Sequence, residues 1–183
     1  MARIPCERTV EPREIDAQVK GADGAAAVLR PITPDDAAAL VNFHATLSSD
    51  TTHMRFFNVH PHLSETEVRH FTHVDHHDRE AIVVIAEAAI IGVGRLDRIP
   101  DSTDAEVAFV VSDTYQNHGI GTALLMRLAD HARSEGVQRL LASTLCENRA
   151  MIAVFNHSGF NTVRTRDHGV YQYEMVLGAK SRD

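Results

Sequence analysis

Tryptophan is absent from this chain of 183 residues, and cysteine occurs only twice, as Cys6 and Cys146. Two cysteines cannot build the dense disulfide framework that stabilises small secreted proteins, and they suit a reducing compartment. No apolar run is as long as a membrane span, and the first residues contain no hydrophobic signal-peptide segment. These absences predict a cytoplasmic protein that does not enter a membrane.

Basic residues are outnumbered, with 18 Lys and Arg against 25 Asp and Glu, and the formal net charge is -7. A general nucleic-acid surface needs a basic face, so this balance argues against nucleic acid as a partner. It is compatible with a basic protein or an amine as substrate. The length, the 44% hydrophobic content and the 23% charged content are ordinary for one globular domain.

The amino-terminal residues mix charges with proline, glycine and alanine and show no sustained periodicity. We interpret residues 1–24 as a flexible arm and residues 179–183 as a tail. Between them, residues 25–178 are predicted to form a single domain, which no internal repeat or low-complexity segment interrupts.

Helix start signals and apolar periodicity predict the elements of this domain. Thr33 caps a helix that has Pro34 in its first turn, and Ser64 forms a capping box with Glu67. The predicted strands are 25–32, 81–86, 90–96, 105–111, 137–145, 160–164 and 170–176, and the predicted helices are 33–47, 64–72, 119–134 and 149–157.

The segment from Glu106 to Leu125 is the most informative part of the chain. An apolar, β-branched strand is followed by a loop of the form Gln116-x-x-Gly119-x-Gly121, which opens an amphipathic helix. Glycines let the backbone bend tightly and approach a ligand, and the first N–H groups of a helix are free to bind an anion. The segment therefore predicts a phosphate-binding loop, with the carboxylate of Glu106 at the head of the preceding strand.

Spacing excludes two common phosphate-binding loops. A Walker loop needs Lys-Ser or Lys-Thr after its second glycine, but Gly121 is followed by Thr122 and Ala123. A dinucleotide fingerprint needs a glycine or alanine three residues beyond Gly121, where Leu124 stands. The loop matches neither pattern.

The Gln-x-x-Gly-x-Gly loop resembles that of the GNAT acyltransferases, and the resemblance covers roughly residues 28 to 177. Two sets of segments carry it in the expected order. Those similar to GNAT chains in general are Arg30-Pro31-Ile32-Thr33-Pro34-Asp35-Asp36, Glu147-Asn148-Arg149-Ala150-Met151 and Gly159-Phe160. Those similar to the bacterial protein lysine acetyltransferase (Pat) family are Arg55-Phe56-Phe57, Asp75-x-x-Asp78-Arg79-Glu80 and Ala105-Glu106-Val107-Ala108-Phe109.

This resemblance implies an α/β (α+β) fold, in which helices flank a central, mixed and mostly antiparallel splayed sheet. It also implies acetyl-CoA as cosubstrate. The pantetheine would bind the main chain of Phe109, Val110 and Val111, and Asn148 would add a hydrogen bond. The pyrophosphate would bind Gln116, Asn117, His118, Gly119, Ile120, Gly121 and Thr122.

The resemblance gives Glu106 the role of general base, although an exposed glutamate in a salt bridge is the structural alternative. Asn148 could equally serve only as a helix cap. Many relatives have an arginine, with its permanent charge, where this chain has His118. Phe155 stands where many GNAT enzymes have a tyrosine that protonates the leaving thiolate, so the general acid is unassigned.

Two further groups of residues are candidates of lower specificity. His70, His73, His76 and His77 suggest zinc, but their spacing fits neither a zinc finger nor an HExxH helix, and we expect no metal. Cys146 could carry an acyl group, although an inert cysteine is commoner. The residues Asp75, Asp78, Arg79 and Glu80 either line the acceptor groove or form a solvated turn.

The sequence thus predicts an acetyltransferase that moves an acetyl group directly from acetyl-CoA to an amine, most simply a protein lysine. A small-molecule amine is the alternative acceptor, and a non-catalytic module that binds acyl-CoA is the alternative of another class. The Pat resemblance suggests an acyl-CoA synthetase as protein partner, and the chain is expected to be a monomer or a homodimer.

Overall fold

The computed structural model describes residues 13–14, 27–57 and 62–178. Apart from a short strand at Arg13–Glu14, the arm and the tail expected from the sequence lie outside the described residues. The strands are β1 (Arg13–Glu14), β2 (Val28–Pro31), β3 (Arg79–Ala86), β4 (Ala89–Arg98), β5 (Asp104–Val111), β6 (Arg139–Leu145), β7 (Asn161–Asp167) and β8 (Val170–Val176). The helices are α1 (Ala37–Ala45), α2 (Ser49–Phe56), α3 (Glu65–Thr72), α4 (Ile120–Ser134) and α5 (Arg149–Asn156).

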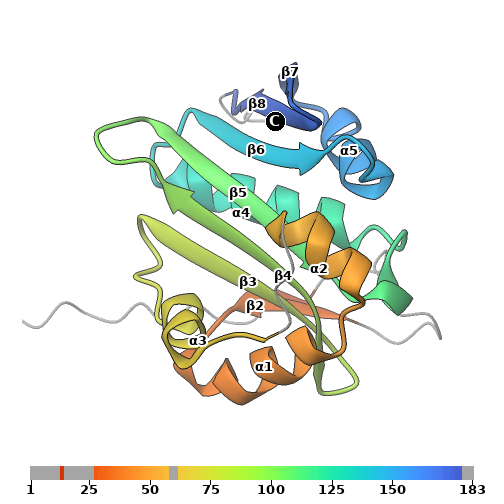
Figure 1. Ribbon diagram of the computed structural model, residues 1–183. Coiled ribbons are helices and arrows are strands. Elements are labelled where there is room, and N and C mark those ends of the chain that lie inside the picture. The colour runs from red at the N-terminus through yellow and green to blue at the C-terminus, as the bar shows by residue number, and fades with distance from the viewer. Residues whose placement is uncertain (1–12, 15–26, 58–61, 179–183) are drawn as a thin grey trace, which may run out of the picture.

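The strands form one sheet in the order β1-β2-β3-β4-β5-β6-β8-β7. Only β5 and β6 are parallel, and every other described neighbour pair is antiparallel. Helices α1, α2 and α3 lie in front of the sheet in Figure 1, and α4 lies behind it. We call these the front and back faces. The predicted mixed, mostly antiparallel sheet flanked by helices is confirmed.

Two apolar cores hold these layers together. On the back face, Leu124 and Leu128 of α4 pack in a cluster with Phe109 of β5. A smaller cluster on the front face joins Phe43 of α1 to Val93 of β4. The helix α4 sits so close to β4 that a side chain at Gly94 would meet Phe109, Leu124 and Leu128 at 3.1 to 3.2 Å.

The sheet is splayed between β5 and β6. Their pairing covers only three positions and ends where Glu106 faces Leu141, although β5 continues to Val111 and β6 to Leu145. Beyond that point the two strands have no register with each other. The opening lies beside α2, which contacts both strands from the front face (Figure 1).

The sequence did not predict α2. Its eight residues, SDTTHMRF, are mostly polar and form no apolar stripe long enough to indicate a helix. The helix begins at the cap Ser48, whose side chain accepts a hydrogen bond from Thr51 N at 3.1 Å. Its position is fixed by contacts with β5 and β6, which are distant in the sequence.

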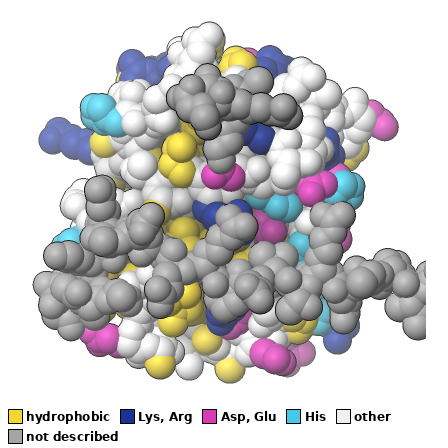
Figure 2. All heavy atoms as spheres, turned by 180° about the vertical axis from the view of Figure 1, so that it is seen from behind, with side chains coloured by type: hydrophobic (Ala, Val, Ile, Leu, Met, Phe, Trp, Pro, Cys, Tyr) yellow, Lys and Arg dark blue, Asp and Glu magenta, His cyan; other side chains and the backbone are white. Residues whose placement is uncertain are grey.

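Histidine and acidic side chains lie next to one another on the back face (Figure 2). His76 Nδ1 is 2.9 Å from the buried Glu80 carboxylate, and His131 Nδ1 is 3.5 Å from the other oxygen of Glu80. His77 pairs with Glu135. The hydrogen bond to Glu80 raises the pKa of His76 above its ordinary value of 6.5.

We predict that His76→Asn destabilises the fold in a pH-dependent way. Because the folded-state pKa is raised, the stabilisation is fully present below about pH 6.5 and is lost as pH rises through the folded pKa. Asparagine tolerates the positive φ of 55° at this position. Urea unfolding should show a loss below about 1 kcal/mol at pH 5.5 and a smaller one at pH 9, since the pair is partly exposed. In a Glu80→Gln background the pH-dependent difference should vanish; its persistence would contradict the assignment.

None of the helices among the described residues has the length and apolar character that crossing a bilayer requires.

Candidate active site

A cavity of about 660 Å³ follows the opening between β5 and β6. Its walls come from α2, β4, β5, the loop before α4 and the start of that helix, β6, α5 and one residue of β8. Of the residues predicted for the site, those that line it are Glu106, Phe109, Val110, Val111, Gln116, Asn117, Gly119, Ile120, Gly121, Thr122 and Asn148. His118 lies outside the lining, is exposed, and contacts the main-chain oxygen of Gln116 through Nδ1 at 2.7 Å.

The main chain of β5 presents hydrogen-bonding groups to this cavity. Ser112 N bonds to Ile91 O in β4, which fixes the phase of the antiparallel ladder. By alternation, the N–H and C=O groups of Phe109 and Val111 point away from β4, toward the stretch where β6 has left the sheet. Val110 instead pairs with Val93 of β4 through its main chain. An extended ligand could therefore pair with alternate residues of β5.

The first turn of α4 presents a second group of donors. The first main-chain hydrogen bond of the helix runs from Ala123 N to Gly119 O at 3.0 Å. The N–H groups of the preceding residues, Gly119 to Thr122, therefore precede the helical ladder, as at any helix start. Gly119 has a φ of 80°, which favours glycine, and open space lies where a side chain would be. This geometry suits a pyrophosphate.

Gln116 ties the loop to the front of the molecule. Its Nε2 donates to Thr51 Oγ1 at 3.0 Å in α2 and to Val111 O at 3.2 Å. Asp113, three residues earlier, accepts from Ser48 N at 3.0 Å, from Ser48 Oγ at 2.6 Å and from Thr51 Oγ1 at 2.7 Å. The position of α2 over the cavity therefore depends on the loop that follows β5.

We predict that Asp113→Ala loosens α2 and lowers the free energy of unfolding by about 1 kcal/mol at pH 7. Burial acts to raise the pKa of Asp113, but the hydrogen bonds from Ser48 and Thr51 outweigh it, and the pKa is lowered. The stabilisation is thus present above the unfolded pKa and is lost as pH falls through the folded one. Urea unfolding at pH 7 and pH 3 tests this, with Asp50→Ala of α2 as control. Equal losses for the two variants at pH 7 would refute it.

Asn148 and Phe155 bound the cavity at α5. Asn148 caps the helix, since its Oδ1 accepts from Met151 N at 3.0 Å. The expected capping role is therefore present, and the amide nitrogen is not needed for it. Phe155 is buried, with its ring centroid 4.8 Å from that of Tyr173. An apolar wall thus stands where many GNAT enzymes have a tyrosine.

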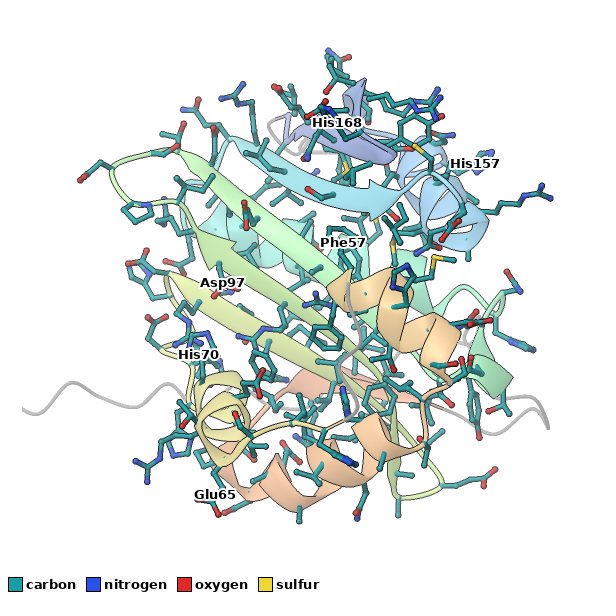
Figure 3. All side chains as sticks on the ribbon, in the orientation of Figure 1. Phe57, Glu65, His70, Asp97, His157 and His168 are labelled. Atoms are coloured by element: carbon teal, nitrogen blue, oxygen red, sulfur yellow. The ribbon has the colours of Figure 1, made fainter. Side chains whose placement is uncertain are left out.

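Glu106 lines the cavity from the front face of β5. It is exposed and stands directly opposite Asp97 of β4 in the ladder. Arg79 of β3 occupies the next place in this row, and its Nε donates to Asp97 Oδ1 at 3.1 Å. Figure 3 shows Asp97 near the end of β4, and Phe57 at the end of α2 in front of the opening. Asp97 is thus paired with Arg79, whereas Glu106 has no ion pair with a described residue.

The arginine and aspartate residues of the cavity lining were not assigned to the site from the sequence: they are Arg55 of α2, with Arg95 and Asp97 of β4. Val93, Arg95 and Asp97 occupy every second position of β4, so all three side chains lie on its front face. A charge that recurs on one side of an otherwise apolar strand was the available signal. For Arg55 the signal was weaker, because α2 itself was not predicted.

The lower-specificity candidates lie outside the cavity lining. Within the part of the chain that the structure describes, no three His, Cys, Asp or Glu residues converge as metal ligands. Asp75 Oδ1 accepts from His77 N and Arg79 N and so fixes a turn. Asp78 pairs with Arg98 at 2.7 Å. Cys146 is a partly buried free thiol.

Comparison with known proteins gives these features a family. The family model described as an acetyltransferase (GNAT) domain matches residues 27–161. The chain belongs to the GNAT acetyltransferases. Their donor is acetyl-CoA, so the predicted enzyme class and cosubstrate are confirmed. The residues described above fit this donor, since the cavity joins unpaired strand groups to the start of α4.

Two relatives of this GNAT domain carry the Pat name. The acetyltransferase Pat of Mycolicibacterium smegmatis is 34% identical over 155 residues, which are 80% of this chain and 44% of that protein. The crystal structure of the GNAT domain of S. lividans PAT is 35% identical with a TM-score of 0.82 and covers 90% of this chain and 96% of that one. The chain thus spans less than half of the mycobacterial Pat, and nearly all of the PAT domain.

A third structure shares the fold. It is that of yncA from Salmonella typhimurium with its cofactor acetyl-CoA, which is 19% identical with a TM-score of 0.68 and covers 86% of this chain and 98% of that one.

Proposed function

We propose that this GNAT domain transfers the acetyl group of acetyl-CoA directly to the side-chain amine of a protein lysine, with Glu106 as general base. The observation that carries the proposal is the position of the Glu106 carboxylate. It is exposed at the point where β5 and β6 separate, within the same cavity as the start of α4. Acetyl-CoA supplies the thioester.

Different groups of the protein would bind successive parts of acetyl-CoA along the cavity. The N–H groups from Gly119 to Thr122 bind the pyrophosphate, and the β5 main chain at Phe109 and Val111 pairs with the pantetheine. Asn148 adds its side-chain amide. A main-chain N–H of β5 is also the group that can donate to the acetyl carbonyl oxygen as it gains charge.

Glu106 addresses the protonation of the acceptor. A free lysine has a pKa of about 10.4, so removing its proton at pH 7 costs roughly 4 to 5 kcal/mol. The carboxylate attracts the ammonium and takes one proton, directly or through a water. The neutral nitrogen then forms a bond to the acetyl carbon, the carbon–sulfur bond breaks, and the nitrogen gives its second proton to the departing thiolate or to water. The leaving thiolate comes from a thiol with a pKa of about 8.5. It can therefore leave without the tyrosine acid that this chain replaces with Phe155.

A protein lysine is favoured as acceptor by the similarity to two proteins named Pat. The test is mass spectrometry of candidate proteins, acyl-CoA synthetases first, incubated with acetyl-CoA and this enzyme. We expect specific lysines to reach high stoichiometry only when the enzyme is present. Identical acetylation without enzyme, together with turnover of a small amine, would replace the protein acceptor with a small molecule.

A further inference from the structure

We propose that Arg55 and Arg95 form an anion subsite for the acceptor, so that the enzyme prefers an amine that carries a carboxylate close by. On a protein this is a lysine next to an aspartate or glutamate. The inference rests on the proposed function and adds the chemistry of the acceptor. It stands on two cations in one cavity, Arg55 and Arg95, neither of which forms an ion pair with a described carboxylate.

Arg95 is a buried cation with few partners. It is 7% exposed, and its side chain lies over the Phe71 ring at 4.3 Å from the ring centroid. Its only hydrogen bond to a described residue runs from Nη1 to Phe71 O at 3.3 Å. A guanidinium has five N–H donors, and most of those of Arg95 form no hydrogen bond with a described residue, while the side chain lines the cavity.

Arg55 brings a second guanidinium from α2 to the same place. Its guanidinium carbon lies over the Phe56 ring, 5.0 Å from the ring centroid, and with Arg95 it lines both the large cavity and a small, mostly apolar one of about 30 Å³. No described carboxylate lies within 4.0 Å of either arginine. Burial lowers the pKa of Arg55, and it lowers that of Arg95 to about 10. A bound anion would offset both penalties.

The charges around Arg55 and Arg95 complement an acceptor that carries both a positive ammonium group and a negative carboxylate. The negative charge of Asp97 acts to raise the pKa of both arginines. However, the Asp97 carboxylate already accepts a hydrogen bond from Arg79. Glu106 remains for the ammonium of the acceptor. Among the described residues that line the cavity, the Glu106 carboxylate and the guanidinium groups of Arg55 and Arg95 therefore have no ion pair with another described residue. The planar donor pair of a guanidinium group matches the geometry of a carboxylate.

The spacing fits a lysine with an acidic neighbour. Arg95 stands opposite Ala108, two residues from Glu106 along β5 and on the same face. Two residues of a strand span roughly 7 Å, which is within reach of a lysine amine and the carboxylate of an adjacent residue. The pyrophosphate end of the cavity, at the start of α4, is separate from this place.

The test is a set of capped peptides with one lysine, in which Asp or Asn occupies each neighbouring position in turn. For wild-type enzyme we expect at least a tenfold higher kcat/KM with Asp than with Asn at one position. In Arg95→Gln and in Arg55→Gln this ratio should fall to about one. Arg98→Gln is the matched control, because Arg98 pairs with Asp78 outside the cavity, and it should keep the ratio. Thermal unfolding and acetyl-CoA titration confirm that each variant is folded.

Equal rates with Asp and Asn at every position, or a preference that survives both arginine substitutions, would overturn the subsite and leave lysine acetylation standing. A second arm compares succinyl-CoA with acetyl-CoA. If the arginines govern that choice instead, the carboxylate belongs to the acyl donor, and the acceptor assignment is wrong. If no peptide reacts, the protein-lysine function fails, and 6-aminohexanoate against hexylamine tests the same subsite. Equal rates there would overturn it as well.

Discussion

Replacing Glu106 with glutamine will lower kcat for amine acetylation by about 10² to 10³ at pH 7, while acetyl-CoA binding stays within about twofold. The amide keeps the size of the side chain but cannot accept the proton of the ammonium. The side chain is exposed and has no described ion pair, so the fold should not depend on it. Initial rates and calorimetric titration with acetyl-CoA measure the two quantities.

The pH profile separates a lost base from a damaged site. If Glu106 removes the proton, the variant depends on the small fraction of amine that is already neutral, and this fraction rises tenfold per pH unit below about pH 10.4. The rate of the variant should therefore approach that of the wild type near pH 10. Glu174→Gln, an exposed carboxylate on β8, is the control and should behave as the wild type. Undiminished turnover by Glu106→Gln at pH 7 would exclude this residue as the base.

Gly121→Val is expected to raise the KM for acetyl-CoA by about 100-fold. The main chain at the start of α4 approaches α5 so closely that a Cβ at residue 121 would lie 3.1 Å from Val154 Cγ2. A branched side chain would fill the side of the cavity where the pyrophosphate has to meet the N–H groups. Steady-state kinetics at saturating acceptor measure the effect.

The matched control is Met126→Val on the same helix. Met126 is exposed and does not line the cavity, so this substitution has the helix cost of a β-branched residue without the steric one. Its KM for acetyl-CoA should stay within about twofold of the wild-type value. A normal KM for Gly121→Val would show that the start of α4 does not hold the pyrophosphate.

Local signals account for most of the correctly predicted elements. The predicted helix 119–134 appears as Ile120–Ser134, and the capping box at Ser64 starts α3 as expected. Both depend on residues within one or two turns of each other, so their physics is readable along the chain. The short polar helix α2 has no such signal, and contacts with β5 and β6 hold it in place.

The residues of the candidate site also fall into two groups: those that local sequence features indicate, and those that only the fold brings together. The loop from Gln116 to Thr122 and Glu106 could be picked out because glycine geometry, a helix start and a strand head are local features. Arg55 of α2 lines the same cavity as Arg95 and Asp97 of β4 because the two elements are brought together by the fold. The partner of Asp97, Arg79, comes from the neighbouring strand β3. The spacing of these residues along the sequence does not predict that they are neighbours in space.

The loop pattern and the ordered segments that resemble GNAT and Pat chains were sufficient to predict the fold class and the family, because each of these motifs consists of residues close together in the chain. The pairing of the strands and the packing of α2 against them determined which other residues line the cavity. Cross-strand register decides which charges share a face, and register depends on long-range contacts. The meeting of Arg55, Arg95 and Asp97 in one cavity is a consequence of that packing.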